Sequence, residues 1–309
     1  LAAFLGLALI NGSVDFSLSP LITENISMTS QLLLLGCLLV GFGIKIPLVP
    51  FHSWLPDAHT QASTPVSVLL AGVLLKLGTY GLLRFGLGMF PDAWALLAPA
   101  MAIWAAISVL YGSFAAIAQR DMKRMVAFSS VGHMGYVLLA AAAATPVALT
   151  GAVFQMVSHG LISALLFLLV GIVYRKTGTR DLEVLRGLLN PERGLPFTGT
   201  LMILGVMASA GLPGTAGFIS EFLVFRGSIQ TYALATLLSM VGSGLTAVYF
   251  LLLVNRAFFG RLAITPADDP ELHKRLDVQL APVALRETIP ALALAIAVIS
   301  IGLLPVGLG

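Results

Sequence analysis

Long apolar runs divide this chain into segments of membrane-spanning length. A helix that crosses the hydrocarbon core of a bilayer needs about 20 predominantly apolar residues. Of the 309 residues, 58% are hydrophobic and only 10% are charged, whereas an average soluble protein has roughly 25% charged residues. The sequence therefore predicts an all-α fold, a polytopic transmembrane helix bundle, with eight candidate spans at 29–51, 62–83, 93–118, 125–143, 147–174, 195–225, 232–254 and 288–308.

Two of these spans contain helix-breaking residues. Proline removes a backbone donor and clashes with the preceding turn, and glycine weakens a helix. An irregular backbone at membrane depth is tolerated only inside protein or beside a wet cavity, and in transporters such breaks mark the ion site. We therefore predict two broken helices. The alternative is that these residues have no special role, because proline and glycine are generally common in membrane helices. The breaking residues are Pro47, Pro50 and Pro56 in one span and Gly211, Pro213, Gly214 and Gly217 in the other.

The basic residues lie in alternate loops. The formal net charge is +3, which alone could suggest a nucleic-acid partner. The loops at 144–148 and 226–231 hold only Arg226, while the cations gather in three other loops. This alternation is the positive-inside pattern, so the charges indicate membrane topology and we expect no nucleic-acid partner. The pattern places three loops on the cytoplasmic or equivalent face. They are the loop with Arg120, Lys123 and Arg124, the loop with Arg175, Lys176, Arg180, Arg186 and Arg193, and the loop with Arg256, Arg261, Lys274, Arg275 and Arg286.

We predict one membrane domain over residues 1–309. The polar stretch before the last span predicts a surface helix at about 268–285, followed by a C-terminal transmembrane helix at about 288–308. The first residue is Leu1, and the apolar run that it begins is too short to span a membrane. We therefore expect an N-terminal truncation, and a cleaved signal peptide is the less favoured explanation.

The cysteine content restricts the chemistry of the chain. Cys37 is the only cysteine, which excludes an internal disulfide, a zinc site built of thiolates and a cysteine-ligated iron–sulfur cluster. The sequence also lacks a metal-ligand spacing and a dinucleotide-binding fingerprint. We expect no cofactor in this chain, so any electron transfer would take place elsewhere.

Two lysines interrupt apolar stretches and have no nearby carboxylate in the sequence. Lys76 lies 14 residues into its run, and Lys45 follows about 15 apolar residues just before the first break. A charge at the bilayer centre costs about 2.5–3.5 kcal/mol on insertion scales, and such residues usually mark an ion path. The alternative for Lys45 is a side chain that extends to the membrane edge.

Two histidines and a glutamate also lie within apolar spans. His133 and His159 occupy consecutive spans beside small residues, and a histidine can pass on a proton because it titrates near neutral pH. Each could instead be a core histidine bonded to a helix carbonyl. Glu221 follows the second break and could alternatively pair with Arg226. His52, Asp57 and His59 are expected to shape the first broken turn or a loop, and the alternative for Asp57 is a proton entry point.

Three segments resemble the antiporter-like membrane subunits of proton-pumping NADH:quinone oxidoreductase, and among them the subunit M or chain 4 branch. The likeness extends from about Leu32 to Phe259, which marks an antiporter-like region at about 29–260. The segments are KIPLVPFHSWLPDAHTQASTPVSVLLAGVLLKLGTYGLLRF, DMKRMVAFSSVGHMGYVLL and GLPGTAGFISEFLVF.

The resemblance implies a fold of 14 helices with two inverted five-helix repeats, each with a broken helix. It also implies a proton relay of Lys45, Lys76, His133, His159 and Glu221. In the family the first lysine pairs with a glutamate on an earlier helix, which this sequence lacks.

The expected function is that of a proton-translocating membrane subunit of an NAD(P)H or ferredoxin:quinone oxidoreductase. Its partners would be other membrane-arm subunits and the lipid bilayer, in a bacterial inner membrane or a thylakoid-type membrane. The alternatives are a subunit of a multisubunit cation/proton antiporter and an inert membrane scaffold.

Overall fold

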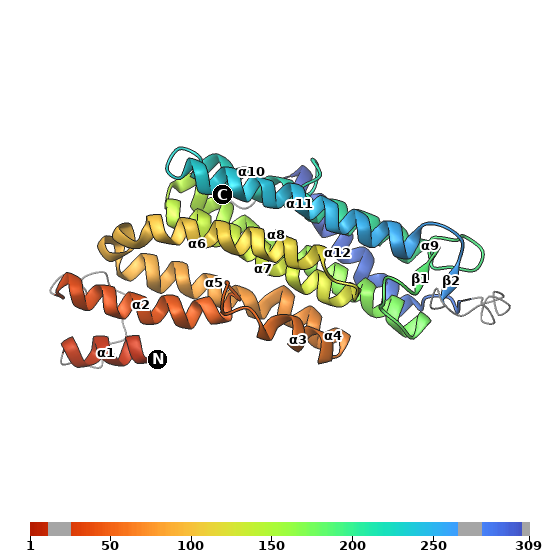
Figure 1. Cartoon of the computed structure of the whole chain (residues 1–309), viewed down its shortest axis with the longest axis horizontal. Helices are drawn as coiled ribbons and strands as arrows, with labels where there is room; N and C mark the ends of the chain where they lie inside the picture. The colour runs from red at the N-terminus through yellow and green to blue at the C-terminus, as the bar shows by residue number, and fades with distance from the viewer. Residues whose placement is uncertain (12–25, 265–279, 305–309) are drawn as a thin grey trace.

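The computed structural model describes residues 1–11, 26–264 and 280–304, and nearly all of these residues form a bundle of long helices (Figure 1). One two-stranded antiparallel sheet pairs β1 (Leu185–Arg186) with β2 (Ala263–Ile264). The α-helical elements are α1 (Ala2–Asn11), α2 (Met28–Lys45), α3 (Trp54–Gln61), α4 (Thr64–Leu69), α5 (Leu75–Gly81), α6 (Pro91–Ile117), α7 (Met122–Ala143), α8 (Pro146–Thr177), α9 (Pro196–Ser209), α10 (Ala216–Ser228), α11 (Ala233–Phe258) and α12 (Leu285–Leu303).

The predicted class, a polytopic membrane bundle, is confirmed. Among the described residues, seven helices are long and apolar enough to cross a membrane. They coincide with seven of the eight predicted spans, and the eighth, at 195–225, is divided between α9 and α10. Among the described residues, a small sheet and one isolated β-bridge between Asp121 and Asp181 join loops outside the spans.

Helices α7 and α8 form the centre of the bundle (Figure 1). Within their most apolar windows, 94% of the residues of α7 and 83% of those of α8 are buried, against 28–50% in the other five spans. A helix that is buried all round needs no amphipathic stripe. The polar residues on α7 and α8 are therefore inside the protein, whereas the surrounding helices expose apolar side chains such as Leu33, Ile103 and Leu251.

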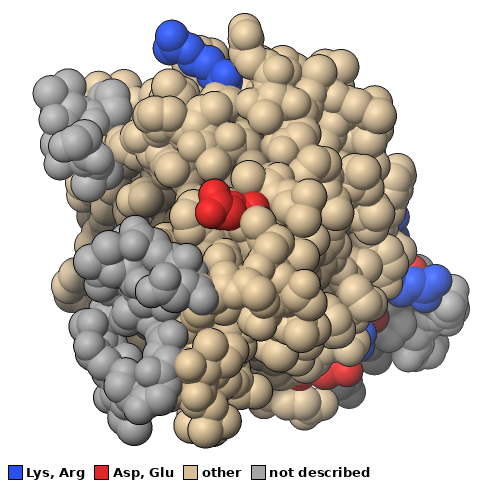
Figure 2. Space-filling model, turned by 90° about the vertical axis from the view of Figure 1, so that its left-hand side faces the viewer, with Lys and Arg blue, Asp and Glu red and all other residues tan. Residues whose placement is uncertain are grey.

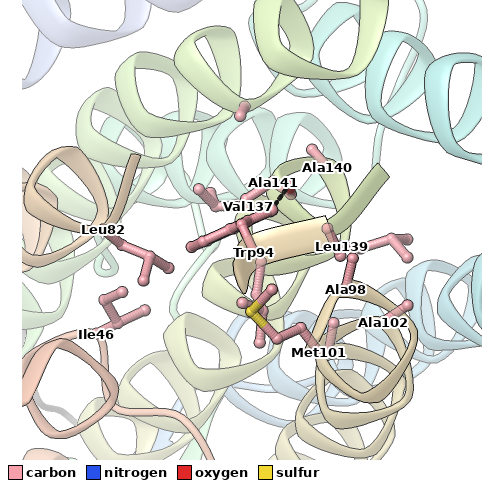
Figure 3. Packing of buried hydrophobic residues seen from close by; sticks show 14 of the residues in the cluster. Ile46, Leu82, Trp94, Ala98, Met101, Ala102, Val137, Leu139, Ala140 and Ala141 are labelled. Carbon is pink, nitrogen blue, oxygen red and sulfur yellow. Dashed lines mark hydrogen bonds between the residues drawn. The ribbon is translucent and has the colours of Figure 1, made fainter. Parts of the chain in front are cut away.

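The part of the core near α6 packs around Trp94 (Figure 3). Its ring is 1% exposed and lies among Leu82, Met101 and Val137, and its Nε1 donates a hydrogen bond of 3.0 Å to the carbonyl oxygen of Ala141. A buried indole N–H usually finds such a partner. This contact joins the N-terminal part of α6 to the end of α7.

The first break separates α2 from α3. Helix α2 ends at Lys45, and residues 46–53 run as turns before α3 begins. Side chains bond to the backbone groups that the break frees: Ser108 Oγ accepts from Val49 N at 3.2 Å, and the indole Nε1 of Trp104 donates to Val49 O. A broken helix at membrane depth requires such partners.

The second break separates α9 from α10 and depends on two glycines. Gly211 has a φ of +76°, which favours a residue without a Cβ. Gly217 packs directly on the carbonyl oxygen of Ala208, where a Cβ atom would overlap it. Both predicted broken helices are therefore confirmed.

The span Thr64–Leu87 contains two π-helical segments that the sequence did not predict. They are η2 (Leu70–Leu74) and η3 (Leu82–Leu87), and they flank α5 on either side. Such segments are rare and frequently occur at functional sites. Lys76 is the second residue after η2.

The three basic loops contact one another in the structure, while the face of the membrane on which they lie stays a prediction. The loop before α7 and the loop after α8 are joined by a hydrogen bond of 2.8 Å from Leu182 N to Arg120 O, and the sheet joins the latter to the loop after α11. Figure 2 views the opposite end, where most of the visible described surface belongs to uncharged residues. The basic loops therefore share one end of the bundle.

The predicted surface helix at about 268–285 falls mostly on residues 265–279, which lie outside the described residues. The predicted C-terminal transmembrane helix corresponds to α12, which begins at Leu285 and ends at Leu303.

Gly217→Ala is expected to destabilise the full-length protein by about 1–3 kcal/mol, because the added methyl overpacks against the backbone. Gly244→Ala is the matched control, since a Cβ there would meet nothing within 4 Å and alanine has the higher helix propensity. Thermal unfolding in detergent measures both variants. Equal midpoints for the two would show that the second break tolerates a side chain.

Candidate functional site

Lys76 is partly buried, and its ammonium group has two hydrogen-bond acceptors. Its Nζ is 2.5 Å from the carbonyl oxygen of Ala71 and 2.7 Å from Nδ1 of His159. Ala71 belongs to η2, whose altered backbone path brings this carbonyl within reach of the ammonium group. A buried ammonium group needs such acceptors, because its desolvation is costly.

The two histidines lie side by side between Lys76 and Glu221. Their ring centroids are 5.4 Å apart, and each side chain is buried. His133 Nε2 lies 3.0 Å from Ser209 Oγ, and its Nδ1 lies 3.5 Å from Gln155 Nε2. The predicted alternative, a histidine bonded to a helix carbonyl, does not apply to either ring among the described residues.

Glu221 completes this row of polar groups from the side of the second break. Its Oε1 is 3.7 Å from Nδ1 of His133, and its Oε2 accepts a hydrogen bond of 2.6 Å from Ser243 Oγ. Arg226 makes no ion pair with Glu221 within the described part of the chain, so that alternative is wrong. We name the row of Lys76, His159, His133 and Glu221 the polar line.

A cavity of about 10 Å³ lies along the polar line, and both histidines, Gln155 and Glu221 line it. This volume is close to the smallest that holds one water molecule. A water there would find several polar partners, including Nε2 of His159, which is buried and makes no hydrogen bond to the described residues.

Close backbone packing sets the position of Lys76. A Cβ atom on Gly160 would lie 2.8 Å from the carbonyl oxygen of Gly72 and 3.5 Å from Cε of Lys76. Glycine at position 160 therefore lets η2 approach α8 directly. This approach brings Lys76 to His159, which precedes Gly160 on α8.

Lys45 is not joined to the polar line by any hydrogen bond or ion pair of the described residues. It is partly buried at the end of α2, and its stem packs on α5, where a Cβ on Gly78 would lie 3.0 Å from Lys45 Cγ. The structure thus brings together four of the five predicted site residues. The role of all five in a proton relay stays a prediction.

His52 of the first broken turn and Asp57 and His59 of α3 make no hydrogen bond to the polar line within the described residues. His59 is fully buried and stacks on Phe167 with the ring centroids 4.3 Å apart, while His52 lies edge-on against Tyr111. Asp57 forms an exposed ion pair of 3.4 Å with Arg124. Of the three residues, the structure places only His52 in the broken turn itself, and their role in shaping the turn stays a prediction.

Sequence reasoning missed the neutral polar residues around the polar line. Ser209, Ser243 and Gln155 each contact one of its members. A single serine in an apolar span is too common to be noticed, but Gln155 could have been found because an amide inside such a long apolar run needs a partner.

The broken helices and the polar line define a polytopic membrane protein with an internal row of ionisable side chains. A family model described as "NADH:quinone oxidoreductase/Mrp antiporter, TM" matches residues 1–246. The chain therefore belongs to this family of antiporter-like membrane subunits.

Curated relatives include two cyanobacterial proteins named NAD(P)H-quinone oxidoreductase chain 4. The one from Thermosynechococcus vestitus is 40% identical over 312 residues, covering 99% of this chain and 56% of the relative. The one from Synechococcus sp. (strain JA-3-3Ab) is 42% identical over 308 residues, covering 97% of this chain and 56% of the relative. The predicted resemblance to chain 4 is confirmed, and the chain spans about half the length of these relatives.

Solved structures show the same fold. A chain of respiratory complex I from Thermus thermophilus is 28% identical with a TM-score of 0.86, and the match covers 99% of this chain and 62% of that one. A chain of the Mrp complex from Dietzia sp. DQ12-45-1b has a TM-score of 0.84 at 23% identity, with 98% of this chain and 61% of that one covered. The second match concerns the fold alone. With the seven apolar helices, these findings confirm the predicted integral membrane protein of a bacterial or thylakoid-type membrane.

Lys76→Met is expected to leave the free energy of unfolding within about 1 kcal/mol of the wild type or to raise it, because an apolar chain of similar length replaces a cation at a site where charge is costly. Thermal unfolding of the full-length protein in detergent measures this, with Lys176→Met at the end of α8 as the control. A loss above about 2 kcal/mol would mean that the bond to Ala71 holds η2 together.

Proposed function

We propose that this chain is a proton-translocating membrane subunit of an NAD(P)H or ferredoxin:quinone oxidoreductase. Quinone reduction would take place in other subunits, and this chain would carry no cofactor and perform no redox chemistry. The observation that supports the proposal best is the polar line, in which Lys76 Nζ lies 2.7 Å from His159 in the buried centre of the bundle.

The contacts allow a stepwise proton transfer. A Lys76 ammonium group can donate to Nδ1 of His159, from which a proton can leave through the unbonded Nε2. The ring centroids of His159 and His133 are 5.4 Å apart and no hydrogen bond of the described residues joins the two rings, so one water in the cavity would bridge them. His133 would then exchange the proton with Glu221 across 3.7 Å, with Lys45 as a further member toward the first break.

The partners would be other membrane-arm subunits of the same complex. The matched structures are chains of multisubunit membrane complexes, which supports such an assembly. The exposed apolar side chains of the outer helices would contact lipid or these neighbours.

A subunit of a multisubunit cation/proton antiporter is the second candidate. It is favoured by the description of the matching family, which includes the Mrp antiporter. The two candidates differ in their energy source: an antiporter exchanges sodium for protons without an electron donor. Proteoliposomes with the full-length protein in its complex separate them, since sodium-dependent exchange in the absence of NAD(P)H or ferredoxin would support the antiporter.

Lys76→Ala in the full-length protein is expected to abolish proton pumping, because the polar line loses the ammonium group that lies 2.7 Å from Nδ1 of His159. The measurement is proton uptake by vesicles together with the quinone reductase rate, and Lys176→Ala is the control. Pumping that persists at a normal quinone reductase rate would contradict the assignment.

Gly160→Ala is expected to reduce pumping severalfold while the complex still assembles, because the new methyl would move η2, and with it Lys76, away from His159. Gly36→Ala is the matched control, since a Cβ on Gly36 meets nothing within 4 Å. The same vesicle assay measures both. An unchanged rate in Gly160→Ala would show that transfer does not depend on the direct contact between Lys76 and His159.

A further inference from the structure

A cationic pocket lies at the basic end of the bundle, between the start of the span Thr64–Leu87 and the end of α8. Its volume is about 590 Å³, and three of its lining side chains are cations, Lys123, Arg175 and Arg180, with no carboxylate in the lining. Hydroxyl groups of Thr60, Ser63 and Thr64 complete the wall. We name this site the basic pocket.

The charges of the basic pocket are only partly compensated. Arg180 Nε lies 3.3 Å from Asp121, and Arg175 pairs with Glu287. Lys123 is 4% exposed, and its Nζ donates to the carbonyl oxygen of Ala62 at 2.7 Å. No carboxylate of the described residues lies within 4.0 Å of Nζ of Lys123.

The N-terminal end of the span Thr64–Leu87 also lines the pocket. Ser63 is the N-cap of the span Thr64–Leu87 and makes no capping bond with its side chain, and the first turn of a helix has backbone N–H groups without intrahelical acceptors. Lys123, Arg180 and this helix start therefore face the same space. Together, these groups favour the binding of an anion with several acceptor oxygens, such as a phosphate.

An apolar groove lies further along the same pair of helices. The groove has a volume of about 570 Å³ and is lined by residues of the span Thr64–Leu87 from Val68 to Tyr80, by α8 from Met156 to Ala164, and by Leu294 of α12. At 1.5 Å per residue, Val68 to Tyr80 extends over about 18 Å, similar to the roughly 15 Å depth of one leaflet of hydrocarbon.

We propose that the basic pocket and the apolar groove together bind one anionic phospholipid, with its phosphate in the pocket and an acyl chain in the groove. The two sites follow one another on the same helices, since Pro65 and Val170 line the pocket while Val68 and Ala164 line the groove. A free phosphate would use the pocket alone and leave the groove unexplained. Basic pockets between helices on this face of a membrane suit anionic headgroups.

The lipid would also cover Lys76 from the side. Lys76 lines the apolar groove, so its stem is the point at which the polar line approaches the bilayer. An acyl chain in the groove would keep water from reaching the ammonium group laterally. This proposal rests on the pocket and the groove and holds whether or not the chain pumps protons.

The test uses the full-length complex, delipidated in detergent, with three probes: dioleoyl phosphatidylglycerol, dioleoyl phosphatidylcholine and inorganic phosphate. We expect phosphatidylglycerol to raise the thermal midpoint and to remain bound in native mass spectra, and the other two probes to do neither. Equal stabilisation by phosphatidylcholine would overturn the selection for charge. Equal stabilisation by inorganic phosphate would contradict the proposed lipid and indicate that the pocket binds a free anion.

Substitutions in the basic pocket test whether this site binds the phosphatidylglycerol. Lys123→Gln is expected to weaken phosphatidylglycerol binding about fivefold, the contribution of about one cation near an anionic headgroup. Arg120→Gln is the matched control, because Arg120 lies at the same end, is 72% exposed and does not line the pocket. Equal binding by both variants would overturn the site.

Leu77→Trp, which fills the groove, is expected to displace the lipid, with Leu33→Trp on the exposed face of α2 as its control. If Leu77→Trp instead blocks assembly and leaves lipid binding intact, a partner helix occupies the groove and the proposal is wrong. The comparison of the three probes on the wild type stands even if a variant fails to fold.

Discussion

The cost of an ammonium group in an apolar interior determines how the centre of this bundle is built. Lys76 is acceptable there because the carbonyl oxygen of Ala71 and Nδ1 of His159 both accept from its Nζ. The first contact needs the π-helical segment η2, and the second needs the close approach of η2 to Gly160. One charge thus requires an irregular helix, a glycine on the facing helix and a histidine beside that glycine.

The same reasoning explains why α7 and α8 occupy the middle of the bundle. Each carries a histidine of the polar line, and the two helices are buried nearly all round. The helices around them expose apolar side chains and surround the two histidines and Glu221, which are buried. The two breaks follow a related rule, because an interrupted helix is stable only where neighbouring side chains bond to the freed backbone, as Ser108 and Trp104 do at Val49.

Much of the fold could be predicted because its signals are local. A run of apolar residues specifies a span by length alone, and proline and glycine specify the two breaks. The segment η2 could not be predicted from local signals, and its Gly72 packs against Gly160, a contact between residues that are far apart in the sequence. The site was partly predictable for the same reason. An isolated charged residue in an apolar run can be identified from the sequence, whereas its contact with a particular histidine or serine on another helix depends on the tertiary structure.

Lys45 and Lys76 show how far equal sequence signals can diverge in structure. Both are single lysines in apolar runs, but Lys76 bonds into the polar line while Lys45 ends its helix at the first break and packs its stem on α5. The end of a helix offers a cation unsatisfied carbonyl groups and the favourable end of the helix dipole, so Lys45 needs no histidine. A mid-helix lysine has neither of these, and only a partner from another helix can satisfy it. The position of a buried charge relative to the helix end therefore determines whether its partners are local or come from another helix.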